Sequence, residues 1–527
     1  MSEVPPGRFS SGRHAGILVP LFSIPSRRSW GIGEIPDLIP LARWMQSAGL
    51  DFVQLLPINE MQEGQSSPYS ALSAMAIDPI FISLDELEEW TVVETNTALS
   101  KEAQAALSRA WHAPHVNYAA VRAAKTHALR QAFTWFLDNH KDSSDARVRA
   151  FESFQERERW WLEDYAIFRA LHDAHGGRHW REWEAGVRDR EPGAMEAARE
   201  RYATPIRYYA YLQWIADEQW QRARIAAAPV GIFGDFPFMV SAHSADVWAR
   251  QHEFDLEGSV GTPPDAFSAS GQDWGLPAYR WDLIRGRDYE WLRERTRRSS
   301  TLFDGFRVDH LIGFYRTYVR RTDGSKGFTP ADEPEQRAQG EYLLSLFAEG
   351  GATIIGEDLG TVPDFMRESL VQRNIPGMKV LRWERDWHAP GQPFLDVRGY
   401  RATSVATSGT HDTETTAEWW DMIPVQERQD VLALPTLQGA GLDPHAPFDD
   451  RVRDALLQTL FASGSNLMIV PIQDVFGWRD RINTPGSVND ENWTWRLPLP
   501  VDDLPVAHES TERAAFLHRL AVQCGRK

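Results

Sequence analysis

Eight short apolar runs, each bounded by turn residues, recur along the chain and alternate with stretches of helical periodicity. They lie at residues 15–22, 51–57, 230–236, 304–310, 352–358, 378–384, 402–408 and 466–472. Short continuous apolar runs are typical of strands that are buried on both faces. The stretch between the first two runs shows apolar residues at helical spacing, namely Leu38, Leu41, Met45 and Ala48. Eight buried strands alternating with helices predict an α/β fold, a (β/α)8 TIM barrel.

Two long segments interrupt this alternation. Residues 58–204 are rich in Arg, Glu, Ala and Trp at helical spacing, which predicts an inserted, mainly helical subdomain between strands 2 and 3. Residues 237–302 are rich in Gly, Pro, Ser and Asp, which predicts an inserted, ordered loop subdomain between strands 3 and 4. We therefore expect residues 1–527 to form a single barrel domain, with both insertions around the C-terminal face of the barrel.

The composition excludes several classes of partner. The chain has 527 residues, of which 42% are hydrophobic and 25% charged, as in ordinary globular proteins. Its net charge of -18 repels phosphate backbones and anionic membrane surfaces. We therefore expect no nucleic acid, no membrane and no obligatory protein partner. The first residues lack the apolar stretch of a secretory signal, and no later run is long enough to cross a bilayer, so we expect a cytoplasmic protein.

The cysteine content excludes some kinds of site, and the tryptophan content is compatible with sugar binding. The single cysteine, Cys524, excludes an internal disulfide and any metal site built from several thiolates. It shares a helical face with three apolar residues, Leu517, Leu520 and Ala521, and is expected to pack there. The 22 tryptophans exceed what cores usually need, and their flat rings stack well on sugars, although most tryptophans are core residues.

Acidic residues close or follow several of the predicted strands, where reactive groups of parallel barrels lie. They are Asp235, Asp309, Glu357 with Asp358, and Asp412. Within residues 305–310, strand alternation places Arg307 and Asp309 on the same face. A guanidinium beside a carboxylate favours the ionised form, which a nucleophile needs.

Carboxylates that are grouped without cysteines or a clear His-x-His pair suit two kinds of site. One holds a divalent metal ion for a phosphorylated or carboxylate substrate. The other performs glycoside chemistry, in which one carboxylate attacks the anomeric carbon and another, about 5 to 5.5 Å away in retaining enzymes, protonates the leaving oxygen. Any single acid could instead cap a helix or pair with an arginine, but four acidic strand ends together disfavour that interpretation.

Seven segments of the chain resemble a known family. Residues 234–248, 305–310, 354–360 and 408–416 (GDFPFMVSAHSADVW, GFRVDH, IIGEDLG and SGTHDTETT) are similar to the signature segments of the alpha-amylase clan. They resemble the versions found in 4-alpha-glucanotransferases of the amylomaltase group, glycoside hydrolase family 77. Residues 67–79, 263–275 and 481–498 (SPYSALSAMAIDP, PPDAFSASGQDWG and RINTPGSVNDENWTWRLP) extend the match. Several linked motifs in order are a far more specific signal than any one alone.

The resemblance implies a role for each matching residue. It makes Asp309 the nucleophile, Glu357 the acid/base and Asp412 the transition-state stabiliser, and it implies no metal or other cofactor. The substrate-binding residues that it implies are Tyr69, Asp235, Phe267, Gln272, Trp274, Arg307, His310, His411 and Asn483. For Asp358 we expect a cap on the following turn. The loop that carries Phe267 and Trp274 is expected to cover bound sugar and exclude water.

The implied activity is that of a 4-alpha-glucanotransferase that moves alpha-1,4-glucan segments from a donor to an acceptor by a retaining double displacement. Its substrates would be malto-oligosaccharides, amylose or other alpha-1,4-glucans, and glucose. Three alternatives remain: a hydrolase of the same clan, a glucan-binding protein without catalysis, and a metal-dependent barrel enzyme. At four positions the chain departs from residues that are common in the family, namely Gly64, Ala266, Leu311 and Ile312. These departures affect what can be expected of the lid and of any secondary glucan-binding site, but not the expected chemistry.

Overall fold

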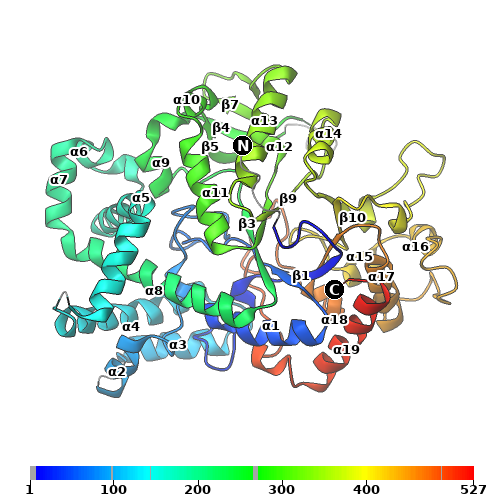
Figure 1. Ribbon diagram of the computed structural model, residues 1–527, viewed down its shortest axis with the longest axis horizontal. Coiled ribbons are helices and arrows are strands. Elements are labelled where there is room, and N and C mark those ends of the chain that lie inside the picture. Colours follow the sequence, from blue (N-terminus) through cyan, green and yellow to red (C-terminus); the bar gives the residue numbers. More distant parts are fainter. Residues whose placement is uncertain (1–6, 97–98, 143, 265–270, 488, 527) are drawn as a thin grey trace.

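Eight parallel strands form a closed barrel at the centre of the structure (Figure 1). The computed structural model describes residues 1–527 apart from 1–6, 97–98, 143, 265–270, 488 and 527. The barrel strands are β1 (His14–Leu18), β2 (Phe52–Gln54), β3 (Gly231–Phe236), β6 (Gly305–Val308), β9 (Thr353–Gly356), β10 (Gly377–Val380), β11 (Ser404–Thr407) and β12 (Leu467–Pro471). Around the barrel their order is β1-β12-β11-β10-β9-β6-β3-β2. Each strand overlaps one predicted apolar run, so the predicted (β/α)8 fold is confirmed.

Helices connect most of the barrel strands and surround them (Figure 1). The longer ones are α1 (Leu38–Ser47), α8 (Ala203–Ala227), α11 (Glu290–Leu302), α13 (Glu333–Ala348), α14 (Asp364–Gln372), α17 (Asp450–Phe461) and α19 (His508–Gln523). The shorter ones are α12 (Ile312–Tyr315), α15 (Thr416–Met422), α16 (Val425–Leu432) and α18 (Ile472–Phe476). In α1 the predicted apolar stripe is buried, and Gly49 follows the helix with a φ of 67° that favours glycine.

The connection between β10 and β11 lacks an α-helix. Residues 381–403, all of which the structure describes, contain only the 3-10 turns η6 (Leu381–Trp383) and η7 (Val397–Gly399). In a regular barrel an α-helix covers the outside of the sheet at this place. Here an irregular segment connects the two strands instead.

Helices dominate the long connection between β2 and β3 and form a lobe beside the barrel (Figure 1). Besides α8, they are α2 (Glu88–Asn96), α3 (Lys101–His112), α4 (Tyr118–Asn139), α5 (Ala146–Ala174), α6 (Ala185–Arg188) and α7 (Pro192–Arg201). Arg147 ties three helices of this lobe together. Its Nε lies 2.9 Å from Glu89, its Nη1 lies 2.8 Å from Glu218, and its guanidinium lies over the Trp214 ring.

The connection between β3 and β6 contains regular structure where a loop was expected. It includes α9 (Ala245–Ala249), α10 (Trp281–Gly286), β4 (Phe254–Thr262) and β5 (Gln272–Tyr279). Strands β4 and β5 form an antiparallel sheet, in the order β5-β4-β7-β8, with β7 (Thr317–Arg321) and β8 (Lys326–Thr329). The sequence analysis did not predict these strands, because the segment is rich in Gly, Pro and polar residues. The pairing of β4 with β5 also includes register shifts, and β4 pairs on its other side with β7, which lies beyond the segment.

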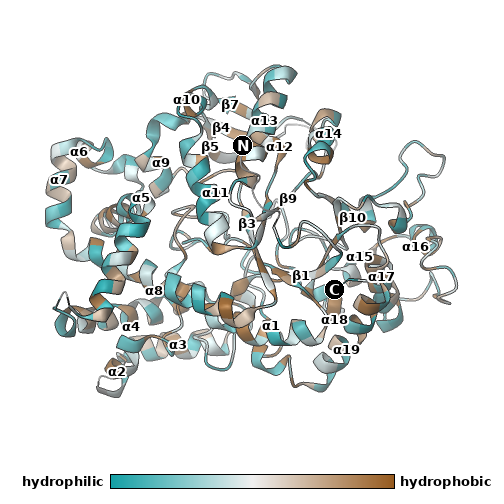
Figure 2. Cartoon of the chain, in the orientation of Figure 1, coloured by the Kyte–Doolittle hydropathy of each residue, from teal (hydrophilic) through white to brown (hydrophobic). Residues whose placement is uncertain are grey.

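Phenylalanine rings and glycines share the space inside the barrel. The Phe52 and Phe233 rings stack at 4.5 Å, and the Phe9 ring packs edge-on against both. Neighbouring strands place glycine opposite these rings, because a Cβ at Gly16 or Gly305 would lie 2.7 Å from the Phe52 or Phe233 ring, respectively. Figure 2 shows hydrophobic residues concentrated on the inner strands and hydrophilic residues on the outer helix faces.

The substitution Gly305→Ala should destabilise the protein, because the new methyl group would also lie 2.7 Å from the backbone oxygen of Thr353. We expect overpacking to lower the free energy of unfolding by about 1–3 kcal/mol, measured by urea denaturation. The matched control is Gly327→Ala in β8, where nothing lies within 4 Å of the Cβ position. Equal unfolding midpoints for the two variants would contradict this packing argument.

Candidate active site

A single buried guanidinium joins three of the predicted strand-end carboxylates. Arg307, on β6, is only 3% exposed. Its Nε and Nη2 bind both oxygens of Asp235 at the end of β3, at 3.1 and 2.8 Å. Its Nη2 also lies 2.8 Å from Oδ1 of Asp309, and its Nη1 lies 2.8 Å from Oε2 of Glu357, which follows β9. Because β3, β6 and β9 are neighbours in the barrel, their carboxyl ends place these three acids around one cation.

Asp309 and Glu357 interact electrostatically, and their pKa values shift in opposite directions. Burial raises the pKa of Asp309 well above its usual range, and the neighbouring Glu357 adds to the rise while Arg307 opposes it. Burial also acts to raise the pKa of Glu357, but Arg307 and the backbone N–H of His310, 2.8 Å from Oε2, outweigh it and lower that pKa. Arg307 thus favours the ionised form of Asp309, as expected, but burial and the neighbouring carboxylates outweigh it. Two carboxyls so coupled titrate as a pair that retains one proton.

Asp412 lies in the loop after β11 and is held by a neighbouring amide. Its side chain is 45% exposed, and its Oδ1 accepts a 2.6 Å hydrogen bond from Nδ2 of Asn483. The other oxygen, Oδ2, lies 3.5 Å from Nε2 of His411. The predicted residues Asn483 and His411 thus contact a predicted catalytic carboxylate directly, and they leave it open to a ligand.

Tyr69 connects this loop to the Arg307 cluster. Its hydroxyl donates to Oδ2 of Asp235 at 2.6 Å and lies 3.1 Å from Nε2 of His411. The Tyr69 and His411 rings also stack at 5.6 Å, with 22° between their planes. Trp493, which the sequence analysis did not single out, packs 5.6 Å from both rings. Its position in the matched segment 481–498 was the signal that could have identified it.

Trp274 and Gln272 lie on β5, beside the predicted nucleophile segment. The Trp274 ring packs edge-on against His310 at 4.9 Å, and its Nε1 donates to Oε1 of Gln272 at 3.0 Å. His310 has a φ of 43°, in the left-handed region. Phe267 lies outside the described residues.

A cavity of about 790 Å³ adjoins Glu357 and Asp412. Two exposed tryptophans line it, Trp383 at 44% and Trp387 at 58% exposed, and both belong to the irregular segment 381–403. Exposed indole rings beside Glu357, the predicted acid/base, are suited to stacking on a sugar. The sequence analysis missed both residues, because it treated this stretch only as a strand and its continuation.

The sequence predicted that Asp358 caps the turn that follows it, but the structure shows a different contact. Its Oδ1 instead accepts a 2.7 Å hydrogen bond from the backbone N–H of Met378, in the next barrel strand. Burial raises the pKa of Asp358 above its usual value. Its contact is thus structural, since it ties the end of β9 to β10.

No helix in the described part of the chain is long and apolar enough to cross a bilayer. Within the same residues, no group of three or more His, Cys, Asp or Glu side chains is arranged to hold a metal ion.

A barrel with paired carboxylates at the carboxyl ends of its strands is typical of enzymes that act on glycosidic bonds. A profile of the 4-alpha-glucanotransferase family matches residues 19–501. The chain is 31% identical over 514 residues to a 4-alpha-glucanotransferase of Chlamydia pneumoniae, covering 94% of this chain and 93% of that one. It is 32% identical over 523 residues to that of Thermus thermophilus, covering 95% and 98%. The chain therefore belongs to the 4-alpha-glucanotransferase family, and the predicted resemblance is confirmed.

Solved structures agree with this assignment. The amylomaltase from Streptococcus agalactiae in complex with acarbose superposes with a TM-score of 0.80 at 26% identity, covering 98% of this chain and 99% of that one. The amylomaltase from Corynebacterium glutamicum gives a TM-score of 0.81 at 25% identity, covering 97% and 76%. The two likenesses extend over nearly the whole of this chain, the insertions included.

Turnover should show a bell-shaped dependence on pH, because a nucleophile and an acid require one proton on the Asp309–Glu357 pair. As the pH falls through the lowered pKa of Glu357, the pair takes up a second proton and no carboxylate remains to attack. As the pH rises through the raised pKa of Asp309, the last proton is lost and none remains for the leaving oxygen. The measurement is kcat/KM for maltotriose from about pH 4 to 9, with circular dichroism to verify folding. A rate that stays constant to the alkaline end in folded protein would contradict the shared proton.

Proposed function

We propose that this chain transfers alpha-1,4-glucan segments with Asp309 as nucleophile, Glu357 as acid/base and Asp412 as transition-state stabiliser. The observation that carries the proposal is the contact of one guanidinium, that of Arg307, with both Asp309 and Glu357 at 2.8 Å. This contact orients the second oxygen of each carboxyl group. Family membership supports transfer over the hydrolase and over a glucan-binding protein without catalysis.

In the first step, Asp309 attacks the anomeric carbon of the donor glucan while Glu357 gives a proton to the departing glycosidic oxygen. Before the attack the shared proton moves from Asp309 to Glu357, which leaves the nucleophile ionised and the acid protonated. The bond from the anomeric carbon to the leaving oxygen breaks as the bond to Asp309 forms. The result is a covalent glucosyl-enzyme.

In the second step, Glu357 accepts the proton of the acceptor 4-hydroxyl, whose oxygen displaces Asp309 from the anomeric carbon. Two inversions retain the alpha configuration. Asp412, held by Asn483 and flanked by His411, binds the ring hydroxyls of the donor sugar more tightly in the flattened transition state than in the ground state.

The sugar at the nucleophile side would lie against Tyr69, Asp235, Arg307, His310 and His411. We propose Trp274 and Gln272 for the positions beside it, together with Phe267. Malto-oligosaccharides, amylose and related alpha-1,4-glucans are the donors, and a glucan or glucose is the acceptor. The net charge of -18 is compatible with these uncharged substrates, and we propose that the protein acts on them in the cytoplasm, without a nucleic acid, membrane or obligatory protein partner.

Incubation with maltotriose distinguishes transfer from hydrolysis. We expect glucose and a ladder of longer oligomers with almost no rise in total reducing ends, because transfer conserves the number of glycosidic bonds. Chromatography of the products and a reducing-sugar assay provide the two measurements. Steadily climbing reducing ends, without any oligomer longer than maltotriose, would show that the chain is a hydrolase.

The two central carboxylates should respond differently to isosteric substitution. Glu357→Gln should lower turnover of maltotriose by about 10²–10⁴-fold and leave binding largely intact, because the amide keeps the shape but supplies no proton. Asp309→Asn should abolish covalent labelling by a slow fluorinated glucosyl substrate, measured by mass spectrometry of peptides. Labelling of another carboxylate in the wild type would overturn the assignment of the nucleophile.

A further inference from the structure

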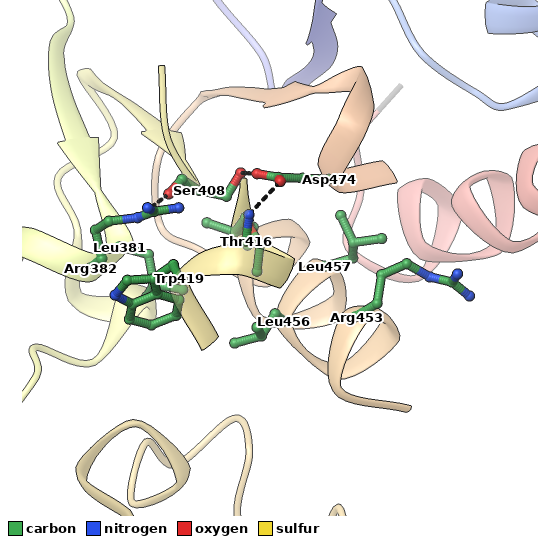
Figure 3. Close-up of a pocket in the computed structure, with 10 residues that line it drawn as sticks. Leu381, Arg382, Ser408, Thr416, Trp419, Arg453, Leu456, Leu457 and Asp474 are labelled. Carbon is green, nitrogen blue, oxygen red and sulfur yellow. Dashed lines mark hydrogen bonds between the residues drawn. The ribbon is translucent and has the colours of Figure 1, made fainter. Parts of the chain in front are cut away.

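A buried carboxylate ties together the two ends of the loop that carries Asp412. Asp474, on α18, is 3% exposed, and its Oδ2 accepts a hydrogen bond from the Ser408 hydroxyl at 2.6 Å. Its Oδ1 accepts another from the backbone N–H of Thr416, also at 2.6 Å (Figure 3). Ser408 follows β11 directly and Thr416 begins α15. One side chain therefore fixes both ends of the loop 408–416.

A buried guanidinium holds the same loop from the side of β10. Nε of Arg382 donates to the carbonyl oxygen of Ser408 at 3.0 Å, and its Nη1 donates to that of Glu414 at 3.1 Å. Figure 3 shows Arg382 and Asp474 on opposite sides of Ser408. A cavity of only about 10 Å³ remains among Arg382, Ser408, Thr416, Asp474 and the apolar side chains around them.

These two charges are costly to bury, since each loses its hydration. Burial lowers the pKa of Arg382, although the nearby carboxylates of Asp474 and Glu414 oppose this shift. In the described part of the chain no ion pair joins Arg382 to Asp474, and the contacts above connect each of them to the loop instead. Apolar side chains of similar volume would fill this space at a lower cost, but they would not hold the backbone of the loop.

We propose that Asp474 and Arg382 are positioning residues that act through Asp412. By fixing the loop 408–416, they aim the Asp412 carboxylate at the ring hydroxyls of the donor sugar. This inference rests on the proposed role of Asp412. Asn483 binds one oxygen of that carboxylate, and Nη2 of Arg481 donates to the backbone carbonyl oxygen of Asp412 at 3.1 Å. Asp474 and Arg382 instead hold the backbone toward the two ends of the loop, at Ser408, Glu414 and Thr416.

The substitution Asp474→Ala should lower kcat for glucan transfer by roughly 10²-fold with little change in KM, because a small displacement of Asp412 weakens mainly the transition state. Asp474→Asn should recover part of the rate, since an amide can still contact both Ser408 and Thr416. Ser408→Ala removes one of the two contacts and should fall between wild type and Asp474→Ala. If Asp474→Ala fails to fold, the kcat values of Asp474→Asn and Ser408→Ala, compared with wild type, test the proposal instead.

The matched control is Ser465→Ala, which breaks the buried 2.6 Å hydrogen bond to Ser404 at the opposite end of β11. It should lower the melting temperature without changing kcat. If Asp474→Ala and Ser465→Ala lower the melting temperature alike and both leave kcat unchanged, Asp474 is only structural and the proposal is wrong.

A double-mutant cycle tests whether the effect passes through Asp412. In an Asp412→Ala background, Asp474→Ala should cause little further loss of the rate of glucosyl-enzyme formation from a glucosyl fluoride, since the group it positions is gone. The same fold-loss in both backgrounds would overturn the proposal. Full activity of Asp412→Ala alone would instead remove the proposed role of Asp412, and this inference with it, while wild-type transfer from maltotriose would still support the enzyme class.

Discussion

The contact of one buried guanidinium with three carboxylates is the interaction on which the proposed chemistry depends. Arg307 supplies a single positive charge to Asp235, Asp309 and Glu357, so full ionisation of the three acids would leave two uncompensated negative charges in a buried site. Holding a proton on the Asp309–Glu357 pair relieves part of that repulsion. The same electrostatics that make the cluster tolerable therefore provide both requirements of glycoside transfer, a carboxylate and an acid.

The barrel brings the residues of this cluster together from three separate short strands. Residues far apart in the chain come within hydrogen-bonding distance because β3, β6 and β9 are parallel neighbours whose carboxyl ends meet on one face. This arrangement is predictable from sequence, since apolar runs mark the strands and strand alternation assigns Arg307 and Asp309 to one side. The positions of Tyr69, His411 and Asn483 were accessible only through the family resemblance, because loops bring them to the site.

Other features depended on information that local patterns do not contain. The sheet formed by β4, β5, β7 and β8 joins strands from two connections, and its bulges and glycines obscure the period of two on which strand prediction depends. The pKa order of Asp309 and Glu357 follows from burial and from the His310 N–H, neither of which a sequence displays. Trp383 and Trp387 reach the site because residues 381–403 form no α-helix, and nothing in their spacing indicates that absence.

The two sides of the site differ in a way that suits transfer. On the nucleophile side, Tyr69, Asp235 and His411 are linked by hydrogen bonds to each other and to Arg307, so a sugar there meets a preorganised surface. A cavity of about 790 Å³ beside Glu357 and Asp412 is lined by exposed indole rings, which are suited to receiving glucans of different length and to releasing them. A covalently held donor needs a rigid site through two displacements, whereas successive leaving groups and acceptors must exchange. A preorganised donor side joined to an open cavity with aromatic walls would meet both needs. In the proposed mechanism Glu357 exchanges a proton with the departing chain and with the acceptor that replaces it.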